Sequence, residues 1–91
     1  MGLRWDHYIG GETRPPASGE YLSSFDPCTG APAAAVAAGG AVDVEAAVQA
    51  AAAAAPAWRA LRPIERGRVL LELARQMRER ARPLAETERM E

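Results

Sequence analysis

The spacing of apolar residues changes once along this chain, close to Gly39. Before that point, short alternating runs are separated by glycine and proline, which is typical of strands and turns. After it, apolar residues recur about every 3.6 positions, as they do along one face of a helix. The pattern predicts a strand-and-turn arm at residues 1–38 and a helical part at residues 39–91. The expected fold class is α+β, with β-hairpin strands followed by three α-helices.

The arm carries the signature of a tight hairpin. Residues Trp5 to Ile9 alternate between apolar and polar, and Gly10-Gly11 can adopt the positive φ angles that a two-residue hairpin turn requires. We expect a returning strand at Glu12 to Arg14, which the prolines that follow must end because proline donates no backbone hydrogen bond.

Two more strands are expected in the arm, at Tyr21 to Phe25 and at Ala33 to Ala38. The segment between them is a predicted turn. Asp26 can bond the backbone ahead of it, Pro27 presets φ, and Gly30 tolerates a left-handed conformation.

The helical part predicts three helices. Proline marks their limits: Pro56 should end the first, and Pro63 and Pro83 should open the second and third. The predicted helices are residues 41–55, 63–80 and 83–91. The second has the strongest apolar face, made of Val69, Leu70, Leu73, Ala74 and Met77.

The start of the first helix needs separate attention. Gly40 at the N-cap supplies no side-chain acceptor, while Asp43 places a carboxylate where it complements the helix dipole. Strand, Gly39-Gly40 and helix are also the order of a phosphate-binding loop. A dinucleotide fingerprint needs three spaced glycines, and Asp43 would repel a pyrophosphate. We therefore predict no cofactor site here.

The chain is short of bulky core residues. Hydrophobic residues make up 48% of its 91 residues, but 21 of them are alanine, which removes little surface from water. This shortage predicts one incomplete domain that finishes its burial against something outside this chain. A small alanine-rich helical domain is the alternative that composition leaves open.

Charge and cysteine content exclude several classes of partner. The net charge is −1, so nucleic acid is not an expected partner. All eleven basic residues are arginine, which suggests a coding bias and no mechanism. The arginines of residues 59–82 can pair within their helix, as Arg68 with Glu72 and Arg75 with Glu79, which predicts a solvated face in preference to an anionic ligand. The sequence contains no secretion signal and no membrane span, and its single cysteine favours the cytoplasm.

No residue of the chain predicts chemistry of its own. Cys28, the only thiol, falls in a turn without an activating cation or base. His7 is expected on the surface of the hairpin with no carboxylate tied to it by spacing, and one His with one Cys cannot fill a zinc site. Trp58 is expected to pack between two helices. The predicted catalytic, cofactor-binding and metal residues are therefore none.

Three segments in order carry a resemblance to a known family. They are Tyr8-Ile9-Gly10-Gly11-Glu12, Phe25-Asp26-Pro27-Cys28-Thr29-Gly30, and Ala57-Trp58-Arg59 leading into Pro63-Ile64-Glu65-Arg66. From about Tyr8 to Glu91 the chain resembles the N-terminal segment of the NAD(P)-dependent aldehyde dehydrogenases. The resemblance implies a fold like the start of their α/β cofactor-binding domain. It also implies that the sequence stops within a helix that continues in the family.

The resemblance also implies a function for the intact enzyme. That enzyme would oxidise an aldehyde to a carboxylic acid through a cysteine thiohemiacetal, pass hydride to NAD or NADP, and hydrolyse the thioester with a glutamate. Those residues, and the glycine motif and lysine that hold the cofactor, lie downstream in the family. This chain alone would be an inactive scaffold, with the remainder of the dehydrogenase as its partner and a homo-oligomer as the intact form.

Two details qualify this interpretation. Gly40 and Arg62 stand where the family more often has side-chain helix caps. The main alternative is a free-standing interaction module that binds a protein through Leu70, Leu73 and Met77.

Overall fold

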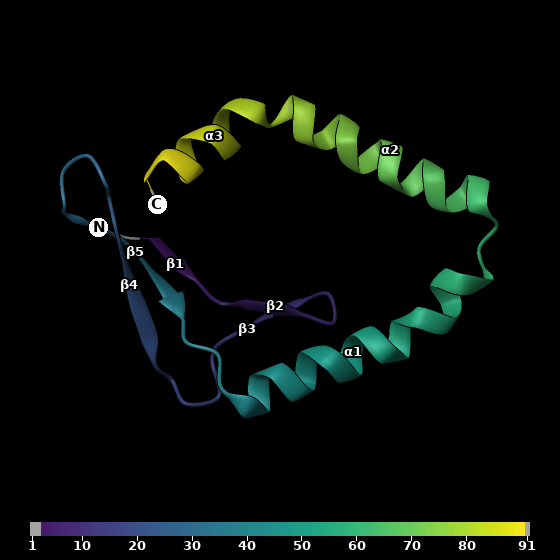
Figure 1. The fold of residues 1–91 in the computed structure, drawn as a ribbon, viewed down its shortest axis with the longest axis horizontal. Helices are drawn as coiled ribbons and strands as arrows, with labels where there is room; N and C mark the ends of the chain where they lie inside the picture. Colours follow the sequence, from purple (N-terminus) through teal and green to yellow (C-terminus); the bar gives the residue numbers. More distant parts are fainter. Residues whose placement is uncertain (1–2, 91) are drawn as a thin grey trace.

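A computed structural model of the chain describes residues 3–90 (Figure 1). Five strands precede three helices, which confirms the predicted fold class. The strands are β1 (Leu3–Trp5), β2 (His7–Ile9), β3 (Glu12–Arg14), β4 (Tyr21–Phe25) and β5 (Pro32–Ala37). The helices are α1 (Ala41–Ala60), α2 (Pro63–Glu79) and α3 (Ala81–Met90).

The first predicted strand is in fact two strands in two different sheets. Asp6 separates β1 from β2, and its carboxylate accepts a hydrogen bond from the Tyr21 hydroxyl at 2.6 Å and pairs with Arg4 at 3.2 Å. β1 lies parallel to β5, with Leu3 opposite Ala34, and β4 pairs with the other edge of β5 in the antiparallel sense. The alternation of residues 5–9 could not reveal this break, because Asp6 is held by contacts with β4 and β1.

The two predicted turns of the arm form as expected. Gly10 and Gly11 have φ angles of 63° and 81°, and they join β2 to β3 in a two-stranded antiparallel sheet. Gly30 has φ of 75°, and the Asp26 side chain accepts a hydrogen bond from the Cys28 backbone N–H at 2.8 Å. Local turn chemistry was therefore sufficient to predict both.

Helix α1 runs through Pro56 to Ala60, so the predicted end at residue 55 is wrong. A proline inside a helix removes one backbone hydrogen bond and crowds the preceding turn. Here the preceding turn consists of alanines, whose methyl groups leave room for the ring and whose helix propensity is the highest of any residue. The helix continues because its alanine run outweighs the local penalty.

Helix α2 agrees with the sequence prediction to within one residue, whereas α3 begins at Ala81 instead of Pro83. Pro83 occupies the first turn of α3, where backbone N–H groups have no partner within the helix, so the missing donor costs little. The predicted end of this helix at Glu91 lies outside the described residues.

The chain is an open, ring-like layer (Figure 1). Its extents are 47 × 34 × 16 Å, and its radius of gyration of 16.6 Å exceeds the roughly 12 Å typical of a compact domain of this length. Within residues 3–89 the buried apolar side chains are Ile9, Pro16 and Ala34. The predicted shortage of core is confirmed, since most of the bulky apolar side chains remain exposed.

Candidate functional site

Asp43, in the first turn of α1, connects segments that are far apart in the sequence. One carboxylate oxygen, Oδ1, accepts the backbone N–H of Ala17 at 3.0 Å, and Oδ2 accepts that of Gly40 at 3.1 Å. These two N–H donors, with a smaller contribution from His7, hold the pKa of the Asp43 carboxyl below its usual range. Asp43 therefore joins the arm to the helix and caps the helix that Gly40 leaves uncapped.

His7 lies beside this carboxylate, contrary to the expected surface position. Its side chain is 19% exposed, and Nε2 lies 3.5 Å from Oδ2 of Asp43, without a hydrogen-bond partner. Sequence spacing could not predict this pair, because β2 and α1 meet only after the whole arm has folded. A histidine next to a carboxylate can orient a proton, but catalysis by such a pair also needs a nucleophile.

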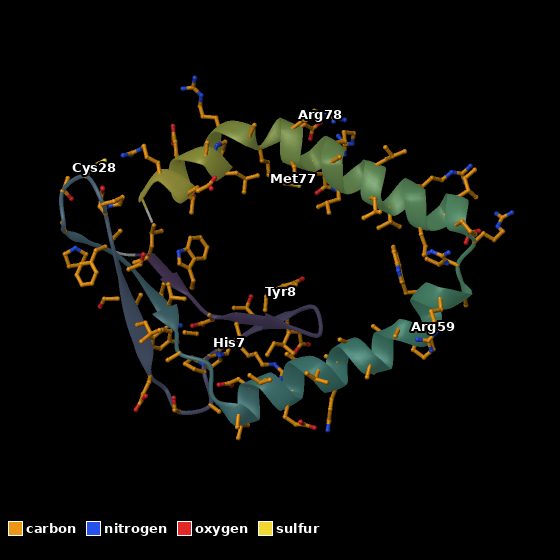
Figure 2. The ribbon with its side chains drawn as sticks, viewed as in Figure 1. His7, Tyr8, Cys28, Arg59, Met77 and Arg78 are labelled. Atoms are coloured by element: carbon orange, nitrogen blue, oxygen red, sulfur yellow. The ribbon has the colours of Figure 1, made fainter. Side chains whose placement is uncertain are left out.

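The cysteine of this chain lies apart from that pair. Cys28 is exposed in the turn between β4 and β5, well away from His7 (Figure 2). That Cys28 has no catalytic role stays a prediction. Among the described residues, no three His, Cys, Asp or Glu side chains gather where they could hold a metal ion.

Side chains of this chain already lie against the glycine pair before α1. The Gly40 N–H bonds to Asp43, and a methyl group at Gly39 would lie 3.5 Å from the His7 ring. An anion approaching this helix N-terminus would meet a carboxylate already in place. The geometry therefore does not suit a dinucleotide phosphate.

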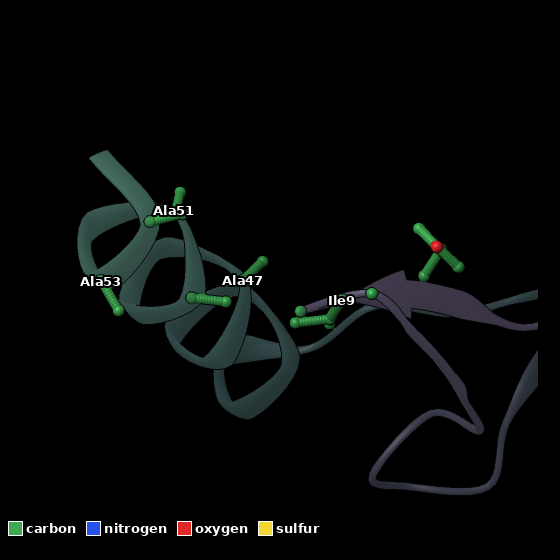
Figure 3. Close-up of a pocket in the computed structure, with 9 residues that line it drawn as sticks. Ile9, Ala47, Ala51 and Ala53 are labelled. Carbon is green, nitrogen blue, oxygen red and sulfur yellow. The ribbon is translucent and has the colours of Figure 1, made fainter. Parts of the chain in front are cut away.

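An open hollow lies between the β2–β3 turn and α1 (Figure 3). Its volume is about 690 Å³, and it is lined by hairpin residues 8–11 and by five alanines of α1: Ala47, Ala50, Ala51, Ala53 and Ala54. Ile9 points toward α1 beside Ala47, and a methyl group at Gly10 would lie 3.8 Å from the Ala50 Cβ. Its walls are mostly methyl and methylene groups, so it offers packing surface and no convergent polar groups for catalysis.

Arg75 of α2 pairs with glutamates of the same helix. Arg75 bonds both Glu72 and Glu79 at 2.5 Å, and this contact lowers the pKa of Glu72 to about 2. The predicted Arg75–Glu79 pair is present, whereas Glu72 pairs with Arg75 in place of Arg68. These pairs make one face of α2 a charged surface, in line with the predicted solvated face.

Both ends of the α1–α2 connection are capped in ways the sequence analysis did not foresee. The Arg66 guanidinium donates to the backbone carbonyls of Arg59, at 3.4 Å, and Leu61, which places a cation at the C-terminus of α1. At the start of α2, Glu65 accepts the Arg62 N–H at 3.2 Å and so replaces the missing side-chain cap. Trp58 nearby stays 42% exposed, so its packing between helices is incomplete.

Comparison with known proteins places this chain in a family. The sequence model of the aldehyde dehydrogenase family matches residues 14–91, and the chain belongs to that family. A probable aldehyde dehydrogenase of Streptomyces coelicolor is 43% identical over 97% of this chain, and an aldehyde dehydrogenase of Paracoccus denitrificans is 40% identical over 93%.

A solved structure shares the fold closely. The crystal structure of PnpE in complex with nicotinamide adenine dinucleotide superimposes with a TM-score of 0.92 at 38% identity, covering 97% of this chain and 18% of PnpE. The chain likewise spans about 17% of the length of the curated relatives described above. It corresponds to an N-terminal portion of such enzymes, and these matches give no support to a free-standing interaction module.

Within residues 3–90, no helix is both long enough and apolar enough to cross a bilayer.

Proposed function

We propose that this chain is the structural N-terminal portion of an NAD(P)-dependent aldehyde dehydrogenase and contains none of its catalytic, cofactor-binding or metal-binding residues. The observation that carries the proposal is a family match along residues 14–91 in a chain that spans about 17% of its relatives. The intact enzyme would oxidise an aldehyde to a carboxylic acid with NAD or NADP and would be a homo-oligomer.

The lack of a cofactor role is supported by the start of α1. A dinucleotide phosphate would have to replace Asp43 at Gly40, and the carboxylate is held there by two backbone N–H groups. The cofactor would then bind to the remainder of the polypeptide. An exposed Cys28 that forms no disulfide suits a reducing cytoplasm, which we propose as the site of action.

The role of this chain would be to brace the rest of the enzyme. The arm, residues 1–38, and the helical part, residues 39–91, would form one incomplete domain whose apolar surface is covered by the remaining chain. A fragment of this kind, isolated in solution, should bind a hydrophobic dye and self-associate. A sharp two-state melt from a monodisperse monomer would contradict this expectation.

The direct test is the intact mass of the native protein, captured from its source cells with an antibody against residues 8–30. We expect a mass several times the 9.7 kDa of this chain, together with aldehyde-dependent reduction of NAD or NADP by the captured species. A mass near 9.7 kDa would overturn the proposal that the chain works as part of a full-length dehydrogenase.

A further inference from the structure

Helix α2 has one face whose charged side chains are paired with each other and another face whose apolar side chains are exposed. Arg75, Glu72 and Glu79 satisfy each other on the charged face. On the other side runs a stripe of apolar side chains, each 50–58% exposed, and no residue of α2 is buried. The stripe consists of Val69, Leu70, Leu73 and Met77. Seventeen residues of amphipathic helix therefore have no partner for their apolar face within the described chain.

The hairpin presents a further apolar group to the same space. Tyr8 is 75% exposed, and Figure 2 shows Tyr8 and Met77 directed into the interior of the ring while Arg78 points outward. Tyr8 and Met77 come from opposite ends of the sequence. Their common orientation indicates a single surface, which we call the inner surface and define by Tyr8, Val69, Leu73 and Met77.

The amount of exposed area indicates how large the missing partner is. The chain exposes 7056 Å², whereas a compact protein of its mass exposes about 5100 Å². The excess, on the order of 1900 Å² on this chain alone, is more than the roughly 800 Å² that each partner contributes to a standard stable interface. An isolated surface of this size is unusual for a monomer.

The comparisons indicate how much further polypeptide is available to cover this surface. PnpE has the same fold over the matched segment, and about four-fifths of its chain lies outside that segment. The open ring is therefore a conformation that exists within a much longer polypeptide. The expected occupant is the unmatched part of an aldehyde dehydrogenase, which we call the body.

We propose that the inner surface is a docking site for an aldehyde dehydrogenase body and that the body binds it without a peptide bond joining the two chains. This inference rests on the proposed function. A covalent link raises the effective concentration of the two parts but adds no contact between them. An interface in the area class of obligate complexes does not need that link to persist.

The experiment uses the 91-residue chain carrying an affinity tag. It is expressed together with the Streptomyces coelicolor relative, shortened by the segment that this chain matches. The readout is the amount of soluble body retained per tagged chain, with the oligomeric state measured by light scattering. We expect body and chain to be recovered in equal numbers.

Single substitutions locate the interface. Met77→Glu and Tyr8→Ser, from two different elements, should each reduce the retained body about tenfold, since each removes a bulky apolar contact. Arg78→Glu, on the outward side of the same helix turn, should leave retention within about twofold of the unaltered chain. Because α2 has no buried residue, Met77→Glu should keep the helical circular dichroism signal.

The remaining outcomes overturn the proposal. They are no body retained by the unaltered chain, equal retention by Met77→Glu, or a homodimer of the chain that excludes the body. A native mass several times 9.7 kDa combined with failure of docking would reject only this inference. A native mass near 9.7 kDa would reject the proposed function independently.

Discussion

The junction of the arm with α1 and the α2–α3 half of the chain are built in different ways. The buried residues of the described chain all lie in the first half: Ile9 and Ala34 in strands, Pro16 in the loop after β3, and Asp43 in the first turn of α1. The α2–α3 half has no comparable core. Its helices are supported by local contacts such as the Glu65 cap and the Arg75 ion pairs.

The two regions are therefore stabilised by two different kinds of contact. Contacts distant in sequence hold the arm against α1, so that junction can be stable by itself. Local contacts are enough to make α2 and α3 helical, but they cannot determine where those helices lie relative to the arm. The position of α2 and α3 then depends on whatever covers their apolar face.

The largest expected effect on stability is at the junction of the arm with α1. Ile9→Ala should destabilise the chain by about 2 kcal/mol, because it removes a nearly buried side chain between the hairpin and α1. Leu73→Ala, at a side chain 54% exposed, should change stability by less than about 0.5 kcal/mol. Amide hydrogen exchange in the β2–β3 hairpin and in α2, which does not require two-state unfolding, would compare the two variants. Equal losses would mean that α2 is packed as well as the hairpin is.

The next effect concerns the carboxylate at the junction. Asp43→Ala should increase hydrogen exchange at the Ala17 and Gly40 amides by at least about tenfold, since both lose a charged acceptor. Asp26→Ala is the matched control, because Asp26 also accepts a backbone N–H but only within its own exposed turn. The comparison fails if the Asp26 variant loosens Ala17 as much as the Asp43 variant does.

Acidification should remove the stabilising carboxylate contacts of the two regions at different pH values. A carboxyl whose pKa is lowered in the folded state stabilises that state above its unfolded pKa, and this contribution disappears as the pH falls through the folded pKa. The Asp43 contribution should thus be complete at pH 5 and decline below about pH 4. The Glu72–Arg75 pair should persist until about pH 2.

Amide protection factors measured between pH 5 and pH 2, corrected for the intrinsic pH dependence of exchange, would follow both regions. Ala17 and Gly40 should lose protection over this range. Unchanged protection of those two amides at pH 2 would show that the ionised Asp43 carboxylate does not hold the junction.

The smallest expected effect is a gain in the stability of α1. Gly40→Ser would add a side-chain cap to α1 in open space, at a φ of −112° that any residue can adopt. The gain should be a few tenths of a kcal/mol, since replacing a capping side chain by glycine costs about that much. Amide hydrogen exchange in the first two turns of α1, measured in parallel on the two chains, would detect it. A loss of stability would mean that the serine disturbs the Asp43 bond to the same N–H.

Features determined by neighbouring residues were predictable from sequence. The hairpin turn at Gly10-Gly11 and the start of α2 at Pro63 both depend on the φ preferences of the residues involved. The α+β fold class could be predicted from such local features. The amphipathic face of α2 was equally visible, because a period of 3.6 needs no knowledge of the partner.

Features determined by tertiary contacts were not predictable from sequence. The break at Asp6 depends on Tyr21, and the position of His7 depends on Asp43, a residue of a later element. The passage of α1 through Pro56 was missed for a different reason. The helix passes Pro56 because of the alanines around it, and the local preference of proline alone does not indicate this.

The parallel pairing of β1 with β5 has a consequence for how the chain is made. The β2–β3 hairpin can close once Arg14 has left the ribosome, because both its strands are then available. Leu3 to Trp5, although synthesised earlier, must wait for Ala34 to Val36 before they have a partner. The first strand in sequence is thus among the last to enter a sheet, and until then its unpaired backbone is open to chaperones and to neighbouring nascent chains.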